Sequence, residues 1–571
     1  MVFFRRLLCR LFPLLLLVHA LWASAQGIDL LAPPEITNFL KPFLPDGDFS
    51  DAAGREQLQR RLAKNLPELL STEGYFSPEL KFVWKGDRLA VTIQPGIQTM
   101  VTTVDIRMEG NLTEQQRDAL VAGWLLPVGQ VFRQADWSRA KEALLAKLLA
   151  EEHPAAALKD SSAQIDPATH AAQLHVVFDS GPVYRFGPIK VIGLQRYRQD
   201  LVGRYNVNIN TGQAYDEEKL SALQRALQSS PYFSSVQVNL DREGTTVVDG
   251  VAFAPVQVRV TEREPYRLGF GIGASSNTGA RGEVNFHSND FLYQSWELNS
   301  GVRLEQKHSA AYADVFLPPD RTQGRNSFGV LMETADIQGL KTDSFSLGAQ
   351  RVQQRGQLAT RFSVNWQLEN KYPDNVISTT NRALVLNSMW TWRQLDSLLD
   401  PRRGLVAQLQ VGGASRALLS DRDFVRILGR AQVYLPLGRR DQLMLRGEAG
   451  RTLANSKDGI PQDYLFRAGG TGSVRGYGYQ SLGVTEGTAV VGGRYLLTAS
   501  IEATHWLDEQ WGMAAFFDEG NAADTLPSLK LNRGYGIGGR WKSPAGPLAV
   551  DLAWGQDSRQ PHLHFALAIP F

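Results

Sequence analysis

The chain has 571 residues, 43% of them hydrophobic and 21% charged, and its 60 basic and 58 acidic side chains leave a net charge of +2. This composition excludes a long disordered chain, and the balanced charge gives no indication of nucleic-acid binding. A polytopic helical membrane protein is also excluded, because only one conspicuous apolar stretch is present, at the start. The length predicts several domains, and the 52 glycines favour a β-rich fold with many turns.

Residues 1–25 have the pattern of a secretory signal peptide. Three arginines within the first ten residues precede an apolar stretch from Leu11 to Trp22, and Ala23-Ser24-Ala25 forms a small-x-small cleavage site. The stretch is short for the alternative, a retained membrane anchor. Cys9 is the only cysteine, so we expect the exported chain to lack disulfides, thiol catalysis and thiolate metal sites.

Residues 26–264 predict three α+β modules, at 26–97, 98–182 and 183–264. Each repeats the order strand, helix, helix, strand, strand, at a period of roughly 75–85 residues. The third is clearest, with strands at Phe186–Ile192, Tyr232–Leu240 and Val256–Val260 and helices around Arg198–Arg204 and from Asp216. No metal or catalytic group of residues is recognisable in the modules. His153 is interpreted as a residue that ends a helix and favours its dipole.

Residues 265–571 predict a transmembrane β-barrel, because segments of about ten residues alternate apolar and polar side chains between turns. The last segment is the clearest, with alternate apolar residues from Leu563 to a terminal Phe571. A large soluble β-sandwich is the alternative. About sixteen strands are expected, starting near Tyr266, Arg281, Ser295, Ser309, Ser327, Thr342, Gln357, Arg382, Leu405, Phe424, Gln442, Ala489, Gly512, Arg533, Pro547 and Pro561.

A series of motifs lies in the second half of this region. A long connection, expected on the outside, contains Gly469-Gly470-Thr471-Gly472-Ser473-Val474-Arg475-Gly476-Tyr477. The next strands carry a Gly-Gly pair followed by Ser500-Ile501-Glu502, and then Phe516-Phe517-Asp518-Glu519-Gly520. In this order, with a C-terminal Phe, the series resembles the superfamily of outer-membrane assembly and translocation barrels that includes BamA, TamA and FhaC.

The resemblance implies three POTRA (polypeptide-transport-associated) modules before a 16-stranded barrel, a number that fits TamA better than BamA or the two-partner transporters. The third module departs from the usual pattern, with Ser230-Pro231 where a Gly normally precedes the aromatic pair Tyr232-Phe233. The resemblance further implies an outer-membrane location with the modules in the periplasm, and no enzymatic activity or cofactor. Its implied partners are unfolded outer-membrane clients such as autotransporters, an inner-membrane-anchored, periplasm-spanning TamB-like protein, and membrane lipids.

The chemistry of the long connection suggests a latch made of Val474, Arg475, Gly476, Tyr477, Glu502 and Asp518. Glycines allow the loop to fold back, and a guanidinium can grip a carboxylate with two hydrogen bonds. We therefore expect the loop to enter the lumen, with Arg475 paired to Asp518, Glu502 or both, as the resemblance also implies. The alternative is a loose surface loop. Under the latch hypothesis, charge reversal at Arg475 would be rescued by reversal of Asp518.

A lateral seam is expected where the first strand, Tyr266–Ala274, meets the last, His562–Phe571. Its candidate residues are Tyr266, Gly269, Gly271, Gly273, Phe565, Pro570 and Phe571. Glycine makes a strand easier to deform and proline removes a backbone donor, which predicts a short, weakly hydrogen-bonded seam. The resemblance implies that this seam is a lateral gate. Equally, these residues can be ordinary barrel features.

Two functions remain open. The first is insertion or secretion of outer-membrane clients through the gate, and the alternative is a two-partner secretion transporter that exports one dedicated protein through the lumen. A passive porin would not need three modules. An outer-membrane enzyme is disfavoured because no catalytic motif is present, and His562 and His564 are interpreted as lumen-facing side chains.

Overall fold

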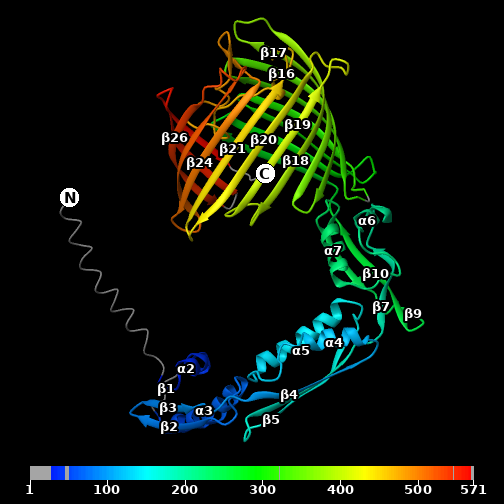
Figure 1. Ribbon diagram of the computed structural model, residues 1–571, viewed down its shortest axis with the longest axis vertical. Coiled ribbons are helices and arrows are strands. Elements are labelled where there is room, and N and C mark those ends of the chain that lie inside the picture. Colours follow the sequence, from blue (N-terminus) through cyan, green and yellow to red (C-terminus); the bar gives the residue numbers. More distant parts are fainter. Residues whose placement is uncertain (1–26, 46–50, 321, 544–545, 568–571) are drawn as a thin grey trace, which may run out of the picture. The chain divides into compact units, whose positions relative to one another are not determined.

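The computed structural model describes residues 27–45, 51–320, 322–543 and 546–567 (Figure 1). The predicted signal peptide, Pro570 and Phe571 lie outside these residues. The chain divides into two compact units, which are described separately. One contains residues up to Lys190 with 208–222 and 238–258, and the other contains 191–207, 223–237 and the chain from Arg259. None of the helices in the described ranges is both long and apolar enough to span a bilayer.

The first module is a three-stranded sheet covered by helices. Its strands are β1 (Ile28–Leu31), β2 (Glu79–Lys85) and β3 (Arg88–Gln94), in the order β1-β3-β2, and its helices are α2 (Pro34–Leu40), η1 (Lys41–Phe43) and α3 (Ala52–Thr72). Four leucines of α3, spaced by four residues, form one buried face: Leu58, Leu62, Leu66 and Leu70. They pack with the buried side chains of β3. The predicted order of the module includes a first strand, whose position the sequence pattern does not locate; it is the short β1, which lies parallel to β3.

The second module repeats this plan. Its strands are β4 (Met100–Glu109), β5 (Ala157–Asp166) and β6 (Ala171–Asp179), in the order β4-β6-β5, and its helices are α4 (Glu114–Ala122) and α5 (Gln134–Ala150). Thr113 caps α4 in a capping box with Gln116. The core includes an edge-to-face pair of Trp124 and Trp137 with centroids 6.0 Å apart.

The third module has the sheet order β7-β10-β8, and the short β9 pairs antiparallel with the first residues of β10. Its elements are β7 (Val183–Ile192), α6 (Gln199–Tyr205), α7 (Glu217–Gln228), β8 (Phe233–Leu240), β9 (Thr246–Val248) and β10 (Val251–Glu262). Ser230, at the departure from the usual pattern, is buried and its hydroxyl donates to the carbonyl of Leu227 at 2.6 Å. Tyr232 is fully buried and belongs to the second unit, where its hydroxyl donates to the carbonyl of Ser295 at 2.7 Å.

His153 does not end a helix, contrary to the interpretation from sequence. Helix α5 ends at Ala150, and His153 lies in the following turn with only 3% of its surface exposed. The turn joins the second and third modules through backbone hydrogen bonds: Glu152 N–H donates to Tyr215 O at 3.0 Å, and Tyr184 N–H donates to Glu152 O at 2.7 Å. Burial lowers the pKa of His153 below its usual value, because the charged imidazolium loses hydration there.

Sixteen antiparallel strands form the barrel of the second unit (Figure 1). They are β11 (Tyr266–Ser275), β12 (Gly279–Phe291), β13 (Trp296–Glu305), β14 (His308–Phe316), β15 (Arg325–Ile337), β16 (Leu340–Arg355), β17 (Leu358–Pro373), β18 (Thr379–Leu395), β19 (Gly404–Ala414), β20 (Phe424–Leu437), β21 (Asp441–Leu453), β24 (Tyr495–Trp506), β25 (Trp511–Ala523), β26 (Asn532–Ser543), β27 (Gly546–Gly555) and β28 (Pro561–Leu567). The predicted fold class, three α+β modules followed by a 16-stranded barrel, is confirmed, while the exact module boundaries stay predictions.

Alternate side chains of these strands are apolar and exposed. Ile272 is 96% exposed, and Ile537, Leu552 and Leu563 are each more than half exposed. Every strand of the barrel is paired with a neighbour, so the backbone satisfies its own polar groups wherever such a ladder runs. An apolar outer surface on paired strands is suited to lipid and unsuited to water.

One predicted strand is placed wrongly. The segment from Ala489 does not begin a barrel strand: β23 (Ala489–Val491) pairs with β22 (Val484–Glu486) in a small hairpin within the connection 454–494. The barrel strand β24 begins at Tyr495 and pairs with β21. Ala489–Val491 is a short apolar run, and such a run fits a loop hairpin as well as a wall strand, which explains the error.

The burial of His153 predicts a pH-dependent junction between the second and third modules. The folded-state pKa lies below the unfolded value of about 6.5, so the unfolded state binds the proton first and stability falls as the pH drops below that value. The protection factors of residues 151–156 and 180–184 in the full chain, which are exchange rates corrected for the intrinsic pH dependence of amide exchange, should therefore fall between pH 7 and pH 5. His153→Leu should remove this dependence.

His170→Asn is the matched control, since His170 lies partly exposed in the turn between β5 and β6. It should leave the pH profile unchanged. An unaltered profile in His153→Leu would show that the junction does not sense this proton.

Candidate functional site

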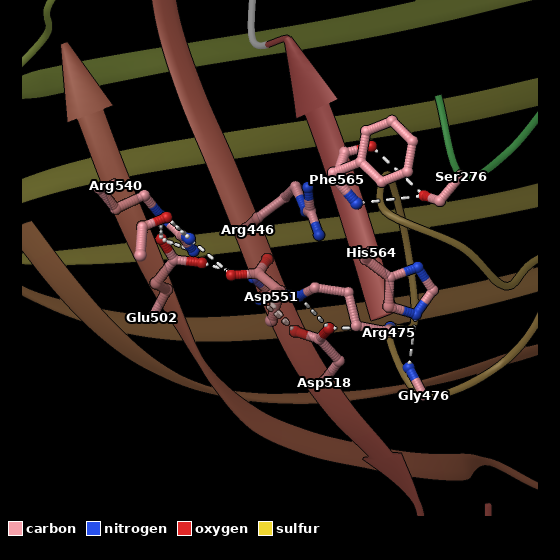
Figure 2. A network of polar contacts seen from close by, with 12 residues as sticks. Ser276, Arg446, Arg475, Gly476, Glu502, Asp518, Arg540, Asp551, His564 and Phe565 are labelled. Atoms are coloured by element: carbon pink, nitrogen blue, oxygen red, sulfur yellow. Dashed lines mark hydrogen bonds and ion pairs between the residues drawn. The ribbon is translucent and has the colours of Figure 1, made fainter. Parts of the chain in front are cut away.

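The connection between β21 and β24, residues 454–494, folds against the inner side of the barrel wall. It contains η2 (Gln462–Tyr464) and the β22–β23 hairpin. Val474, Arg475 and Tyr477 are 0%, 4% and 6% exposed. Arg475 and the adjacent Gly476 make their contacts with strands between β24 and β28, as Figure 2 shows. The loop therefore lies inside the barrel and is not a loose surface loop.

Arg475 is bound most closely by Asp518 on β25. The Nε and the second guanidinium nitrogen donate to the two carboxylate oxygens at 2.7 and 2.9 Å, and the Arg475 backbone N–H also donates to this carboxylate at 3.0 Å. Asp518 is 0% exposed. A bidentate pair with an additional backbone bond fixes both the side chain and the main chain of the loop at this point.

Two further carboxylates meet the same guanidinium. Glu502 on β24 accepts from Nη1 at 2.6 Å, and Asp551 on β27 accepts from it at 3.0 Å. Arg540 on β26 lies on the other side of these two carboxylates, 2.8 Å from Glu502 and 2.5 Å from Asp551. Figure 2 shows these five residues converging from four strands and the loop. We refer to Arg475, Glu502, Asp518, Arg540 and Asp551 as the Arg475 cluster.

The register of two strands explains why the pattern of the sequence identified part of this cluster. Ser500 lies opposite Asp518 and Glu502 lies opposite Phe516 in the β24–β25 ladder, so all four side chains point to the same inner face. The Ser500 hydroxyl donates to Asp518 at 2.5 Å. The guanidinium carbon of Arg475 lies 3.4 Å from the centre of the Phe516 ring, where a cation is attracted to the aromatic face.

Charge is balanced locally once Arg446 is included. Its guanidinium donates to the carbonyl of Ser473, two residues before Arg475, at 3.4 Å. The three positive charges of Arg446, Arg475 and Arg540 therefore balance the three carboxylates of the cluster (Figure 2). Balanced, hydrogen-bonded charges can be buried, whereas removal of one partner leaves another charge uncompensated.

Glycine is required where the loop touches the wall. Gly476 has a φ of +90°, and a Cβ atom there would lie 2.7 Å from the backbone nitrogen of Gly555. A Cβ atom on Gly534 of β26 would lie 1.8 Å from the carbonyl oxygen of Arg475. The loop and strands β26 and β27 thus approach closely enough to exclude any larger residue.

Tyr477 completes the predicted loop motif. Its hydroxyl lies 3.0 Å from a carboxylate oxygen of Asp557 and 3.1 Å from the carbonyl of Arg533. The backbone N–H of Asp557 donates to the same hydroxyl at 3.2 Å. The loop is therefore held near the β27–β28 turn as well as at β24–β27.

A second set of contacts holds the far end of the connection, and no feature of the sequence predicted it. Glu486 of the loop hairpin lies between Lys371 on β17, at 2.7 Å, and Lys457. The buried Glu369, also on β17, accepts from the backbone N–H of Gln462 at 2.9 Å. The loop is thus held to the barrel wall at two separate places, around Arg475 and around Gln462 and Glu486, and carboxylates make the bonds at both.

The seam between the first and last barrel strands differs from the expected one, because the two strands are bridged but not paired over the residues that the structure describes. The sheet runs from β11 to β28, and among the described residues no ladder joins those two strands, so the expected strand pairing is not present there. Instead, one side chain bridges them. The hydroxyl of Ser276, in the β11–β12 turn, donates to the carbonyl of Phe565 at 3.3 Å and accepts from its N–H at 3.2 Å (Figure 2).

The seam glycines are not sterically required. A Cβ atom added at Gly269 would meet nothing within 4 Å, and at Gly271 and Gly273 the nearest atoms are 3.7 and 3.6 Å away. Tyr266, on the opposite face of β11, is 56% exposed and stacks with Phe286 of β12, with centroids 6.2 Å apart. The role of these residues in a deformable strand remains a prediction.

Several site residues were missed by sequence reasoning, namely Asp551, Arg540, Arg446, Ser276 and the loop contact of His564. Asp551 and His564 occupy inward positions of strands predicted correctly, which is a signal too general to single them out. In the part of the chain that the structure describes, no group of three or more potential ligand side chains is placed to hold a metal ion.

The Arg475 cluster predicts a strong asymmetry between two arginine substitutions. Arg475→Ala leaves the carboxylate of Asp518 buried without its partner, which should cost about 3–5 kcal/mol of loop docking free energy. Arg533→Ala breaks a partly exposed pair with Glu519 and should cost less than about 1 kcal/mol. Limited proteolysis of residues 454–494 and the urea midpoint in vesicles measure the difference. Equal behaviour of the two variants would contradict a latch.

The charge exchange Arg475→Glu with Asp518→Arg should restore docking only in part. The new carboxylate at position 475 would still face Glu502 and Asp551, which were not both anticipated from the sequence. The same proteolysis assay checks this. Full recovery would show that Asp518 alone determines the binding of the loop.

Comparison with known proteins is consistent with this geometry. Residues 264–571 match the Omp85 superfamily domain, and residues 184–263 match a POTRA domain described as a surface antigen variable number repeat. The outer membrane protein assembly factor BamA of Nitratidesulfovibrio vulgaris is 26% identical over 194 residues, which are 32% of this chain and 24% of that protein. The matched segment thus spans about a quarter of that relative's length.

The crystal structure of BamA from Haemophilus ducreyi lacking POTRA domains 1–3 superposes with a TM-score of 0.69 at 16% identity, covering 81% of this chain and 98% of that chain. This likeness concerns the fold. The Omp85 match covers more than half of the present chain. The C-terminal unit is an outer-membrane β-barrel preceded by periplasmic POTRA domains, and the chain belongs to the Omp85 superfamily.

Proposed function

We propose that this chain inserts or secretes outer-membrane client proteins, such as autotransporters, through a lateral opening between β11 and β28. The observation that carries the proposal is the seam, where a serine hydroxyl rather than a strand ladder bridges the two strands within the described residues. An edge with unpaired backbone groups is unfavourable in lipid and is stabilised by pairing with an added strand. An unfolded client that forms β-strands supplies such a strand.

The Arg475 cluster supports this proposal because it provides a fixed inner framework. It binds the loop to strands β24 to β27, which lie on the side of the barrel that ends in β28. A seam can open reversibly only if the rest of the wall keeps its shape. The latch residues Val474, Arg475, Gly476, Tyr477, Glu502 and Asp518 are therefore assigned to holding that wall, with no catalytic role.

A TamA-like role forms the finer part of the proposal. It is supported by the three POTRA-like sheets of the described chain. The proposed partner is a TamB-like protein anchored in the inner membrane and spanning the periplasm, which would engage the periplasmic modules, and membrane lipids would move with or around the clients. Client strands can add to the open edges of the module sheets, as extended peptides do elsewhere.

A disulfide across the seam tests lateral opening. The Oγ of Ser276 lies 3.2 Å from the backbone nitrogen of Phe565, so we expect Ser276→Cys with Phe565→Cys to cross-link on oxidation. The oxidised double variant should lose assembly of an autotransporter client in cells, and a reductant should restore it. Each single cysteine variant, treated with oxidant, is the control.

Full client assembly by the cross-linked protein would contradict a lateral opening. The alternative, export of a dedicated protein through the lumen as in two-partner secretion, would then be favoured. Assays of secretion and of membrane insertion in the same cells separate these outcomes.

Stiffening β11 tests whether its glycines matter. Gly269→Ala places a methyl group in open space and should stabilise the strand by about 0.5–1 kcal/mol, while lowering the rate of client assembly. Gly447→Ala on β21 is the matched control, since a Cβ atom there also meets nothing within 4 Å. Equal rates for the two variants would show that deformability of β11 has no role.

A further inference from the structure

The loop crosses the seam independently of the Ser276 bridge. On one side, the side-chain amide of Asn277, in the β11–β12 turn, donates to the hydroxyl oxygen of Thr471 at 3.1 Å. On the other side, the backbone N–H of Gly476 donates to Nε2 of His564, on β28, at 3.0 Å. Figure 2 shows the His564 ring directed at Gly476. The same short segment of the loop thus binds the beginning and the end of the barrel.

His564 is placed to transmit force to the last strand. It is 4% exposed, it lies opposite Asp551 in the β27–β28 ladder, and its neighbour Phe565 carries the bonds to Ser276. Because Nε2 accepts a hydrogen bond, the proton of the neutral ring lies on Nδ1. Displacement of the Gly476 amide would leave this buried nitrogen without its partner, which is costly in a site with little water.

The loop is the fixed member of this contact. Arg475, adjacent to Gly476, is bound to Asp518 through both its backbone and its side chain. A Cβ atom at Gly476 would overlap the backbone of Trp554 and Gly555, so the loop has no room to follow a moving strand. β28 is therefore held by the loop, rather than the reverse.

We propose that residues 471–476 form a staple across the seam, with one leg from Thr471 to Asn277 and the other from Gly476 to His564. His564 is the positioning residue through which the Arg475 cluster holds β28 in the closed barrel. The connection to client assembly rests on the proposed function, whereas the staple itself is a property of the barrel alone. Release of either leg is the event that frees the strand.

A double-mutant cycle distinguishes a staple from two independent contacts. Thr471→Val and His564→Leu each remove one leg, and each should accelerate hydrogen exchange of β11 and β28 amides in the full chain by about five- to tenfold. A staple with one leg cut no longer holds, so the double variant should exchange no faster than either single variant. Independent contacts would instead give multiplied effects.

Three further variants sharpen the cycle. Ser276→Ala removes the direct bridge, and its effect should multiply with that of His564→Leu. His564→Gln offers an amide oxygen to the Gly476 N–H and should restore slow exchange. His562→Leu is the control for loss of a neighbouring ring, because His562 lies on the same strand and face and stacks with His564, with centroids 6.1 Å apart, but its nitrogen contacts the carbonyl of Gln560 rather than the loop. Exchange in β24 and β25 should not change in any of them.

Each outcome has a separate meaning. Unchanged exchange in His564→Leu, or multiplied effects in the Thr471→Val and His564→Leu double variant, overturns the staple whatever the seam does in cells. A non-additive cycle combined with full client assembly by the disulfide-locked protein supports the staple and contradicts lateral insertion. Loss of assembly in the disulfide-locked protein with a multiplied cycle supports the proposed function and overturns the staple.

Discussion

A guanidinium group withdrawn from water needs carboxylates around it, and the interior of this barrel is arranged to meet that need for Arg475. Three carboxylates from β24, β25 and β27 contact it, Arg540 balances two of them from β26, and Arg446 adds a third positive group beside the loop. Each partner belongs to a different strand. The cluster therefore fixes the spacing of the strands and the path of the loop at the same time.

The lipid bilayer sets the opposing constraint, since backbone groups within it must be paired. Ladders meet this condition around the wall from β11 to β28, but not between those two strands in the part of the chain that the structure describes. There, Ser276 satisfies one residue of the last strand, and the loop binds both sides. The proposed function depends on this difference: many hydrogen bonds and ion pairs hold the interior of the barrel, and few hydrogen bonds among the described residues join β11 to β28.

The sequence alone was sufficient for the architecture, because alternation, turns and helix caps are local signals. It did not locate β1 and missed β9, which are too short to show a period, and it misplaced the strand at Ala489 because a short apolar run fits a loop hairpin as well as a wall strand. For the site, the spacing of Glu502 and Asp518 on neighbouring strands was informative. Asp551 and His564 were not distinguishable from other inward residues, since their roles depend on where the loop lies in three dimensions.

Distance along the chain suggests an order for the formation of the barrel. Arg475 is separated from its three carboxylates by 27, 43 and 76 residues, whereas Ser276 and Phe565 are separated by 289. Short chain closures lose less entropy and form sooner than long ones. The charged interior can thus assemble while the early strands are still unplaced, which makes the meeting of the two ends the final step of this protein's own biogenesis.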